Sequence, residues 1–110
     1  MLVELAGEPV ANAATGEVPY LELEGGRVSG TGGCNRLTGT YETSGDTLRF
    51  GPLATTRMAC EEAVMRRETA FLAALAATTR FELAGSSLVL LDADRALARL
   101  EASSERRPGG

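Results

Sequence analysis

Short runs of alternating polar and apolar residues, separated by glycine-containing turns, make up most of this chain. Alternation with a period of two places one set of side chains on each face of a β-strand. The 13 glycines of the 110-residue chain lie mostly between these runs. Glycine tolerates the positive φ angles of tight hairpin turns, so this pattern predicts an antiparallel β-sheet.

The clearest hairpin lies between residues 20 and 30. Residues 20–24 and 27–30 flank a Gly-Gly pair, which suits a two-residue turn with positive φ angles. In that register Leu23 faces Val28 across the two strands. Further strands are expected at residues 36–42, 48–50, 81–83, 88–91 and 96–100.

The hydrophobic period changes once, between residues 61 and 77. Val64, Glu68, Phe71 and Leu75 recur at helical spacing, and Met65 and Leu72 widen that stripe. A helix with one apolar stripe must bury it, and the sheet is the available surface. We therefore expect an α+β fold with a single helix on an antiparallel sheet. Residues 1–102 form one domain in this interpretation, and residues 103–110 form a flexible tail.

Composition excludes several classes of function. The chain has no histidine, and all 11 basic residues are arginine, so a serine–histidine or cysteine–histidine pair and a Schiff-base lysine are absent. A net charge of −4 disfavours a nucleic-acid partner. No apolar run reaches the length of a membrane span, and no signal peptide is recognisable. We expect a non-enzymatic protein with no cofactor and no metal.

Cys34 and Cys60 are the two cysteines, and three interpretations remain open for them. They form a structural disulfide, stay as buried thiols, or serve a redox or metal site. Two thiols without histidine make a poor zinc site. A thiol enzyme would also need a depressed cysteine pKa, for which Arg57 is the nearby cation in sequence.

Residues around Cys34 invite functional interpretations that have simpler structural alternatives. Asn35 either contacts a ligand or satisfies backbone groups beside the glycines. The glycines from Gly30 to Gly33 lack the lysine of a phosphate-binding loop, so a bulge or close backbone approach explains them better. The polar residues Arg36, Thr38, Thr40 and Arg49 form either a solvated outer face or a surface for an anionic partner.

Two separated motifs resemble the META domain, the family named partly for the heat-shock protein HslJ. That family has a glycine-rich segment leading into Gly-Cys-Asn, then Gly-x-Tyr, and later Thr-x-Met-Ala-Cys. The resemblance covers residues 18–100, with Leu2–Leu5 in place of the tryptophan-containing strand that often opens the family. The matching positions are Gly30, Gly33, Cys34, Asn35, Gly39, Tyr41, Thr56, Met58, Ala59 and Cys60.

The resemblance implies a strongly curled, barrel-like antiparallel sheet packed against one helix. Its members are commonly lipoproteins, periplasmic proteins or other exported proteins of the bacterial envelope, and some are linked to heat stress or antibiotic tolerance. No reaction is established for them. We therefore expect a monomeric, exported or membrane-anchored structural or interaction module with a protein or other envelope partner. The alternative is a small-ligand carrier that uses a cavity inside the curled sheet.

Overall fold

The computed structural model describes residues 1–9 and 19–102. It contains one helix and a set of short strands in these residues, so the α+β class is confirmed. Residues 103–110, for which a flexible tail was expected, lie outside the described residues. The elements are β1 (Leu2–Leu5), β2 (Glu8–Pro9), β3 (Tyr20–Glu24), β4 (Arg27–Thr31), β5 (Arg36–Ser44), β6 (Thr47–Phe50), β7 (Ala54–Thr55), α1 (Glu62–Ala77), β8 (Arg80–Ala84), β9 (Ser87–Asp92) and β10 (Arg95–Glu101).

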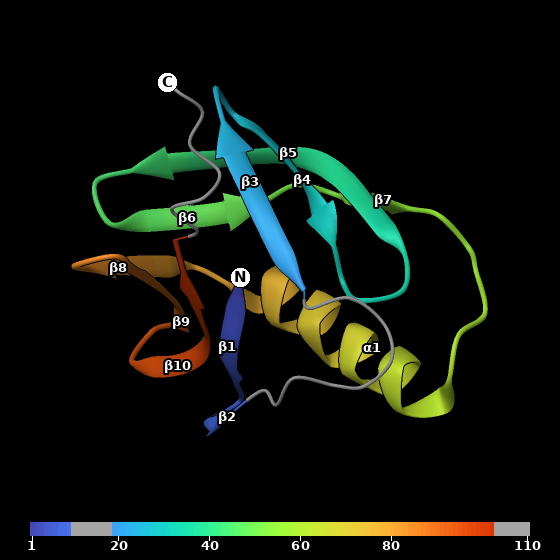
Figure 1. Cartoon of the computed structure of the whole chain (residues 1–110). Coiled ribbons are helices and arrows are strands. Elements are labelled where there is room, and N and C mark those ends of the chain that lie inside the picture. Colours follow the sequence, from blue (N-terminus) through green and yellow to red (C-terminus); the bar gives the residue numbers. More distant parts are fainter. Residues whose placement is uncertain (10–18, 103–110) are drawn as a thin grey trace.

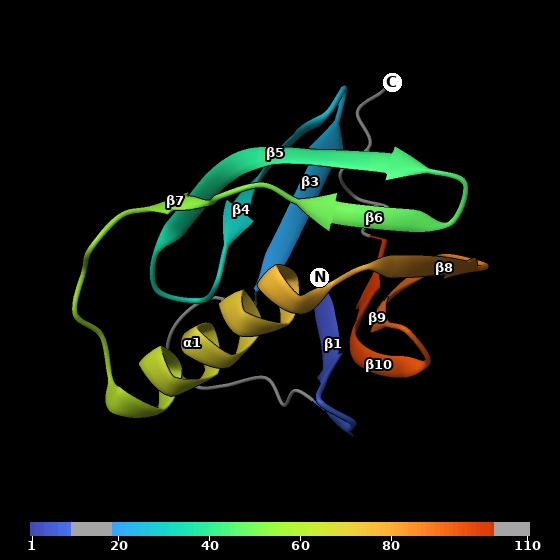
Figure 2. The same cartoon turned by 180° about the vertical axis from the view of Figure 1, so that it is seen from behind.

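The strands of the described residues form one antiparallel, curled sheet that does not close. Their order is β2-β1-β10-β9-β8-β6-β5-β4-β3, and β7 pairs with β5 beside this path. The curl brings the start of β3 back to β1 (Figures 1 and 2), where the Leu2 N–H donates to the Pro19 carbonyl over 2.8 Å. The curled, barrel-like sheet that the family resemblance implied is therefore confirmed.

The hairpin of β3 and β4 has the register that the alternation predicted. Leu23 pairs with Val28, and Gly25 and Gly26 adopt φ angles of 59° and 84°. Two successive positive φ angles define the turn whose twist matches the flanking strands. Local sequence alone therefore determines this part of the sheet.

Helix α1 begins and ends where its sequence predicts, to within one residue. Glu62 opens its first turn, where a carboxylate complements the positive end of the helix dipole. Thr78 ends it in an extended conformation, and the Thr78 hydroxyl donates to the Ala74 carbonyl over 2.8 Å. No helix in the described residues is both long enough and apolar enough to cross a membrane.

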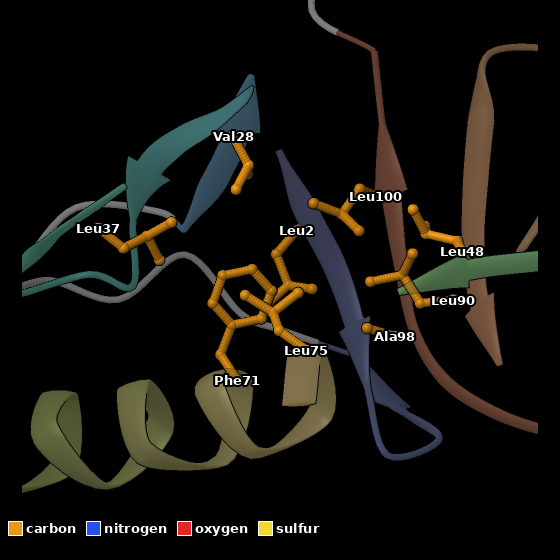
Figure 3. Close-up of a cluster of buried hydrophobic side chains, with 9 residues drawn as sticks. All are labelled: Leu2, Val28, Leu37, Leu48, Phe71, Leu75, Leu90, Ala98 and Leu100. Atoms are coloured by element: carbon orange, nitrogen blue, oxygen red, sulfur yellow. The ribbon is translucent and has the colours of Figure 1, made fainter. Parts of the chain in front are cut away.

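The core lies between α1 and the inner face of the sheet. Phe71 and Leu75 point from the helix toward Leu2 on β1 (Figure 3), and all three are fully buried. Burial of a leucine or phenylalanine side chain contributes roughly 1.5–3 kcal/mol, so these contacts anchor the helix. The rest of the buried cluster comprises Val28, Leu37, Leu48, Leu90, Ala98 and Leu100.

Several expectations about side chains and short elements were wrong. Met65 does not widen the buried stripe of α1, since it is 40% exposed. Leu83 lies on strand β8 as predicted but is 71% exposed; it lies near the end of the strand, beside the turn into β9. The two-residue strands β2 and β7 carry too few residues to show a period, so alternation did not predict them.

The end of β10 carries a carboxylate with a perturbed pKa. Glu101 accepts hydrogen bonds from the Ser87 and Ser86 hydroxyls and lies 2.8 Å from the Arg99 guanidinium. The Ser87 hydrogen bond, then that from Ser86, holds the pKa of Glu101 below its ordinary value. A depressed folded-state pKa contributes stability at pH values above the unfolded pKa, and this stability is lost as the pH falls through the folded pKa.

We expect Ser87→Ala to raise the pKa of Glu101 toward its ordinary value, because the largest interaction favouring the ionised form is removed. Carboxyl carbon shifts followed by NMR from about pH 2 to 7 would measure it. Thr47→Ala, which removes an exposed hydroxyl bonded to Ser44, is the control. An unchanged Glu101 pKa in Ser87→Ala would contradict this assignment.

Candidate functional site

Three segments that are distant in the sequence meet beside the N-terminal half of α1. The first is the loop from β4 into β5, residues 31–36; the second is the loop from β7 toward α1, residues 56–60; and the third is the helix residue Glu68. We refer to these residues together as the junction. Both cysteine motifs lie in it, so the fold brings together the Gly-Cys-Asn and Thr-x-Met-Ala-Cys segments of the family resemblance.

Asn35 is the centre of the junction and is 9% exposed. Its side-chain oxygen accepts hydrogen bonds from the Met58 N–H over 2.7 Å and from the Thr56 hydroxyl over 2.9 Å. Its side-chain amide donates to Glu68 Oε1 over 2.8 Å. The Thr56 hydroxyl in turn accepts from the Arg36 N–H over 3.1 Å. One amide side chain thus joins both loops to the helix.

Glu68 is a buried carboxylate that faces this network, with 7% of its surface exposed. Its Oε2 accepts the Asn35 N–H over 2.6 Å and the Cys34 N–H over 3.1 Å. A charged acceptor bonded to backbone N–H groups makes a stronger hydrogen bond than a neutral one. The sequence placed Glu68 in the buried stripe of the helix without assigning it this role. The sequence did contain a signal for this role, because Glu68 is an acidic residue at a position where the helical stripe is otherwise apolar.

The glycines leading into the junction leave room for Glu68 and for a tight turn. A Cβ on Gly32 would lie 2.5 Å from Glu68 Cγ, so any side chain here would force Glu68 out of its place. Gly33 has a φ of 113°, which is accessible mainly to glycine. The Thr31 hydroxyl donates to the Asn35 carbonyl and accepts the Gly33 N–H. Thr31 was missed by sequence reasoning, because a threonine in a strand carries no special signal.

Gly30 and Gly39 allow close approach of neighbouring chain segments. A Cβ on Gly30 would lie 2.1 Å from the Tyr20 carbonyl oxygen, and one on Gly39 would lie 2.6 Å from Leu53 Cδ2. Within the glycine run, close backbone approach is therefore confirmed at Gly30. Tyr41 lies two residues after Gly39 on β5 and is half-buried against the core.

A disulfide joins Cys34 and Cys60, so the first of the three interpretations of the cysteines is confirmed. Their Cα atoms are 6.1 Å apart, and the bond closes a separation of 26 residues. It ties the start of β5 to the segment just before α1. Because disulfide-bonded sulfur has no thiolate, neither cysteine in this state provides the nucleophile of a thiol enzyme.

Other candidate residues lie outside the junction or point away from it. Met58 contributes its backbone N–H, but its side chain is 55% exposed, and Ala59 beside it is also exposed. The polar outer face predicted on the sheet is exposed at all four positions, which are Arg36, Thr38, Thr40 and Arg49. The described residues contain no group of three or more metal-binding side chains.

Three surface grooves lie among the described residues. One of about 510 Å³ lies between alanines of α1, the turn after β1 and the start of β10. A second of about 360 Å³ lies between α1 and residues 50–55, and a third of about 290 Å³ lies between β3 and the ends of β8, β9 and β10. Leu23, Tyr41 and Phe50 pack against the buried cluster of the core, where the carrier alternative expected a cavity inside the curled sheet.

The comparisons with known proteins agree with this geometry. The model of the META domain family matches residues 1–104, and no curated protein matches the chain. One solved NMR structure is 25% identical, with a TM-score of 0.67, over 89% of this chain and 83% of that one. Another, of a protein from Burkholderia xenovorans, is 33% identical, with a TM-score of 0.58, over 70% of this chain and 56% of that one.

Proposed function

Because this chain belongs to the META domain family, we propose that it is a non-catalytic module of the bacterial envelope that acts through its surface in stress or antibiotic tolerance. The observation that carries the proposal is that the side chains of the family motif are occupied with contacts inside the fold. Asn35, Thr56 and Glu68 bond to one another and to backbone groups, and the cysteines bond to each other.

A catalytic site needs a reactive group held beside a substrate-sized space. In the junction, the buried carboxylate that would be the natural general base already accepts three hydrogen bonds from Cys34 and Asn35. Its Cγ faces the backbone of Gly32 at a distance that excludes even a methyl group. These contacts favour a role of the family motif in holding the fold, and they leave function to the surface.

The disulfide supports the location in the proposal. Protein disulfides persist in oxidising compartments, which in bacteria lie outside the cytoplasm. Cys34 and Cys60 are both half-buried, so a reducing cytoplasm would have access to the bond. An exported or membrane-anchored protein is therefore the setting in which this bond persists.

The proposal is tested by deleting the gene in its host and restoring the protein in two forms, one exported and one retained in the cytoplasm. We expect only the exported form to restore tolerance to envelope stress. We also expect tolerance to rise in proportion to the amount of protein, because a module without turnover acts stoichiometrically. Rescue by the cytoplasmic form would contradict the location, and full tolerance at a small fraction of the natural amount would contradict the non-catalytic role.

A further inference from the structure

Strand β3 lies at one end of the sheet, and no described strand pairs with its outer edge (Figure 1). Alternate residues of an antiparallel strand direct their backbone groups to opposite sides. Because the turn has two residues, the backbone N–H and C=O groups of Glu24 and Glu22 face β4. The backbone N–H and C=O groups of Leu21 and Leu23 therefore point outward. The Pro19 carbonyl lies on that same side and accepts the Leu2 N–H, as this alternation requires.

An apolar groove of about 290 Å³ runs along this edge. The side chains of Leu21 and Leu23 form one wall, and those of Leu83, Leu88 and Leu100 contribute to the other. Leu83 is 71% exposed, the highest value among the large apolar side chains of the described residues. An open strand edge beside an apolar groove satisfies both requirements of strand addition, which are backbone hydrogen bonds and pockets for alternate side chains.

Charge selects among the segments that fit this edge. Glu22 and Glu24 are exposed on the outer face of β3, and opposite charges facing each other across neighbouring strands stabilise pairing, whereas like charges oppose it. A second copy of this chain, aligned over the whole of β3, would place Glu22 opposite Glu22. A segment with basic residues at its outward positions avoids that repulsion.

We propose that the β3 edge binds an extended segment of a partner protein, which adds to the sheet as a further strand. The segment carries apolar residues at alternate positions, which enter the groove, and basic residues between them, which face Glu22 and Glu24. This inference rests on the proposed function, since it names the kind of partner that the surface module takes.

The test uses the full chain, labelled with nitrogen-15, and a synthetic peptide of about six residues that alternates valine and arginine, long enough to span β3 at about 3.3 Å per residue. We expect the Leu21 and Leu23 amide signals to shift and their hydrogen exchange to slow at least about tenfold, because exchange requires opening of the new ladder. A peptide with glutamate in place of arginine should bind much more weakly. A peptide whose backbone nitrogens are methylated on the side that pairs with β3 should also bind much more weakly.

Two variants test the groove against the rest of the surface. Leu83→Ser should weaken the peptide about fivefold, because part of a leucine's apolar contact is lost. Met58→Ser, at an exposed position between β7 and α1 that does not line this groove, should bind the peptide as the unchanged chain does. Glu24→Lys should reduce the preference for arginine over glutamate.

Three results would overturn the inference. The first is equal binding of the N-methylated peptide, which would exclude strand pairing. The second is slow exchange of the Leu21 and Leu23 amides without peptide, which would mean that the edge is already occupied. The third is dimerisation through β3, which would assign the edge to a second copy. Absence of peptide binding, with tolerance still dependent on export, would reject this inference and leave the proposed function intact.

Discussion

Replacing Glu68 with alanine is expected to lower the free energy of unfolding by about 3–5 kcal/mol. The substitution removes the acceptor of three hydrogen bonds, from the Cys34 N–H, the Asn35 N–H and the Asn35 side-chain amide. A buried donor left without a partner costs about 1–3 kcal/mol, and the missing side chain leaves a cavity beside Gly32. Urea unfolding followed by circular dichroism measures the change.

Two further variants separate the hydrogen bonds from the loss of volume. Glu68→Gln keeps the shape but places an amide donor against another donor, since one carboxylate oxygen accepts the Asn35 side-chain amide. We expect it to cost about 1–2 kcal/mol. Glu62→Ala removes an exposed carboxylate from the same helix and should change stability by less than about 0.5 kcal/mol. A Glu68→Ala cost no greater than that of Glu62→Ala would show that the network does not hold the junction.

Removing the disulfide is expected to cost about 3–3.5 kcal/mol, the chain-entropy value for a separation of 26 residues. The matched variant is Cys34→Ser combined with Cys60→Ser, which avoids a free thiol. We expect this variant to remain folded, because Asn35 and Glu68 hold the same two loops through hydrogen bonds. Unfolding in urea, with and without a reducing agent, measures the change.

The reducing agent provides an internal control. It should lower the stability of the unchanged chain to that of the double serine variant and should leave the variant itself unaffected. Alkylation under denaturing, non-reducing conditions, followed by intact mass measurement, should add no alkyl group to chain made in an oxidising compartment. Two alkyl groups on that chain, or equal stability of the two proteins, would contradict the bond as a source of stability.

Much of the fold follows from local patterns. The Gly25-Gly26 turn determined its own hairpin because only one turn type accommodates two positive φ angles between twisted strands. The stripe of Val64, Phe71 and Leu75 determined the helix face, since all three are buried. Curling of the sheet came only from the family resemblance, because alternation specifies the faces of a strand and not the arrangement of strands.

The junction is where local patterns gave the least information. Asn35 and the two cysteines were identified, and the disulfide was among the interpretations of the cysteines. The hydrogen bonds of Asn35 were not predicted, because hydrogen bonds between residues far apart in sequence leave no periodic trace. Glu68 was predicted to lie on the buried face of α1 only because its spacing matches that of the apolar residues in the stripe. Its partners are backbone N–H groups of Cys34 and Asn35, and every residue except proline has such a group.

The sequence by itself determined most of the longer strands, the single helix, the hairpin turns and the two cysteines, because each depends on side-chain period, backbone freedom or residue type over a few positions. Tertiary structure alone decided that Glu68 and Asn35 meet, that Leu83 is exposed, and that β3 ends the sheet beside an apolar groove. These features depend on how the sheet curls around the helix. That arrangement is set by packing of the whole core.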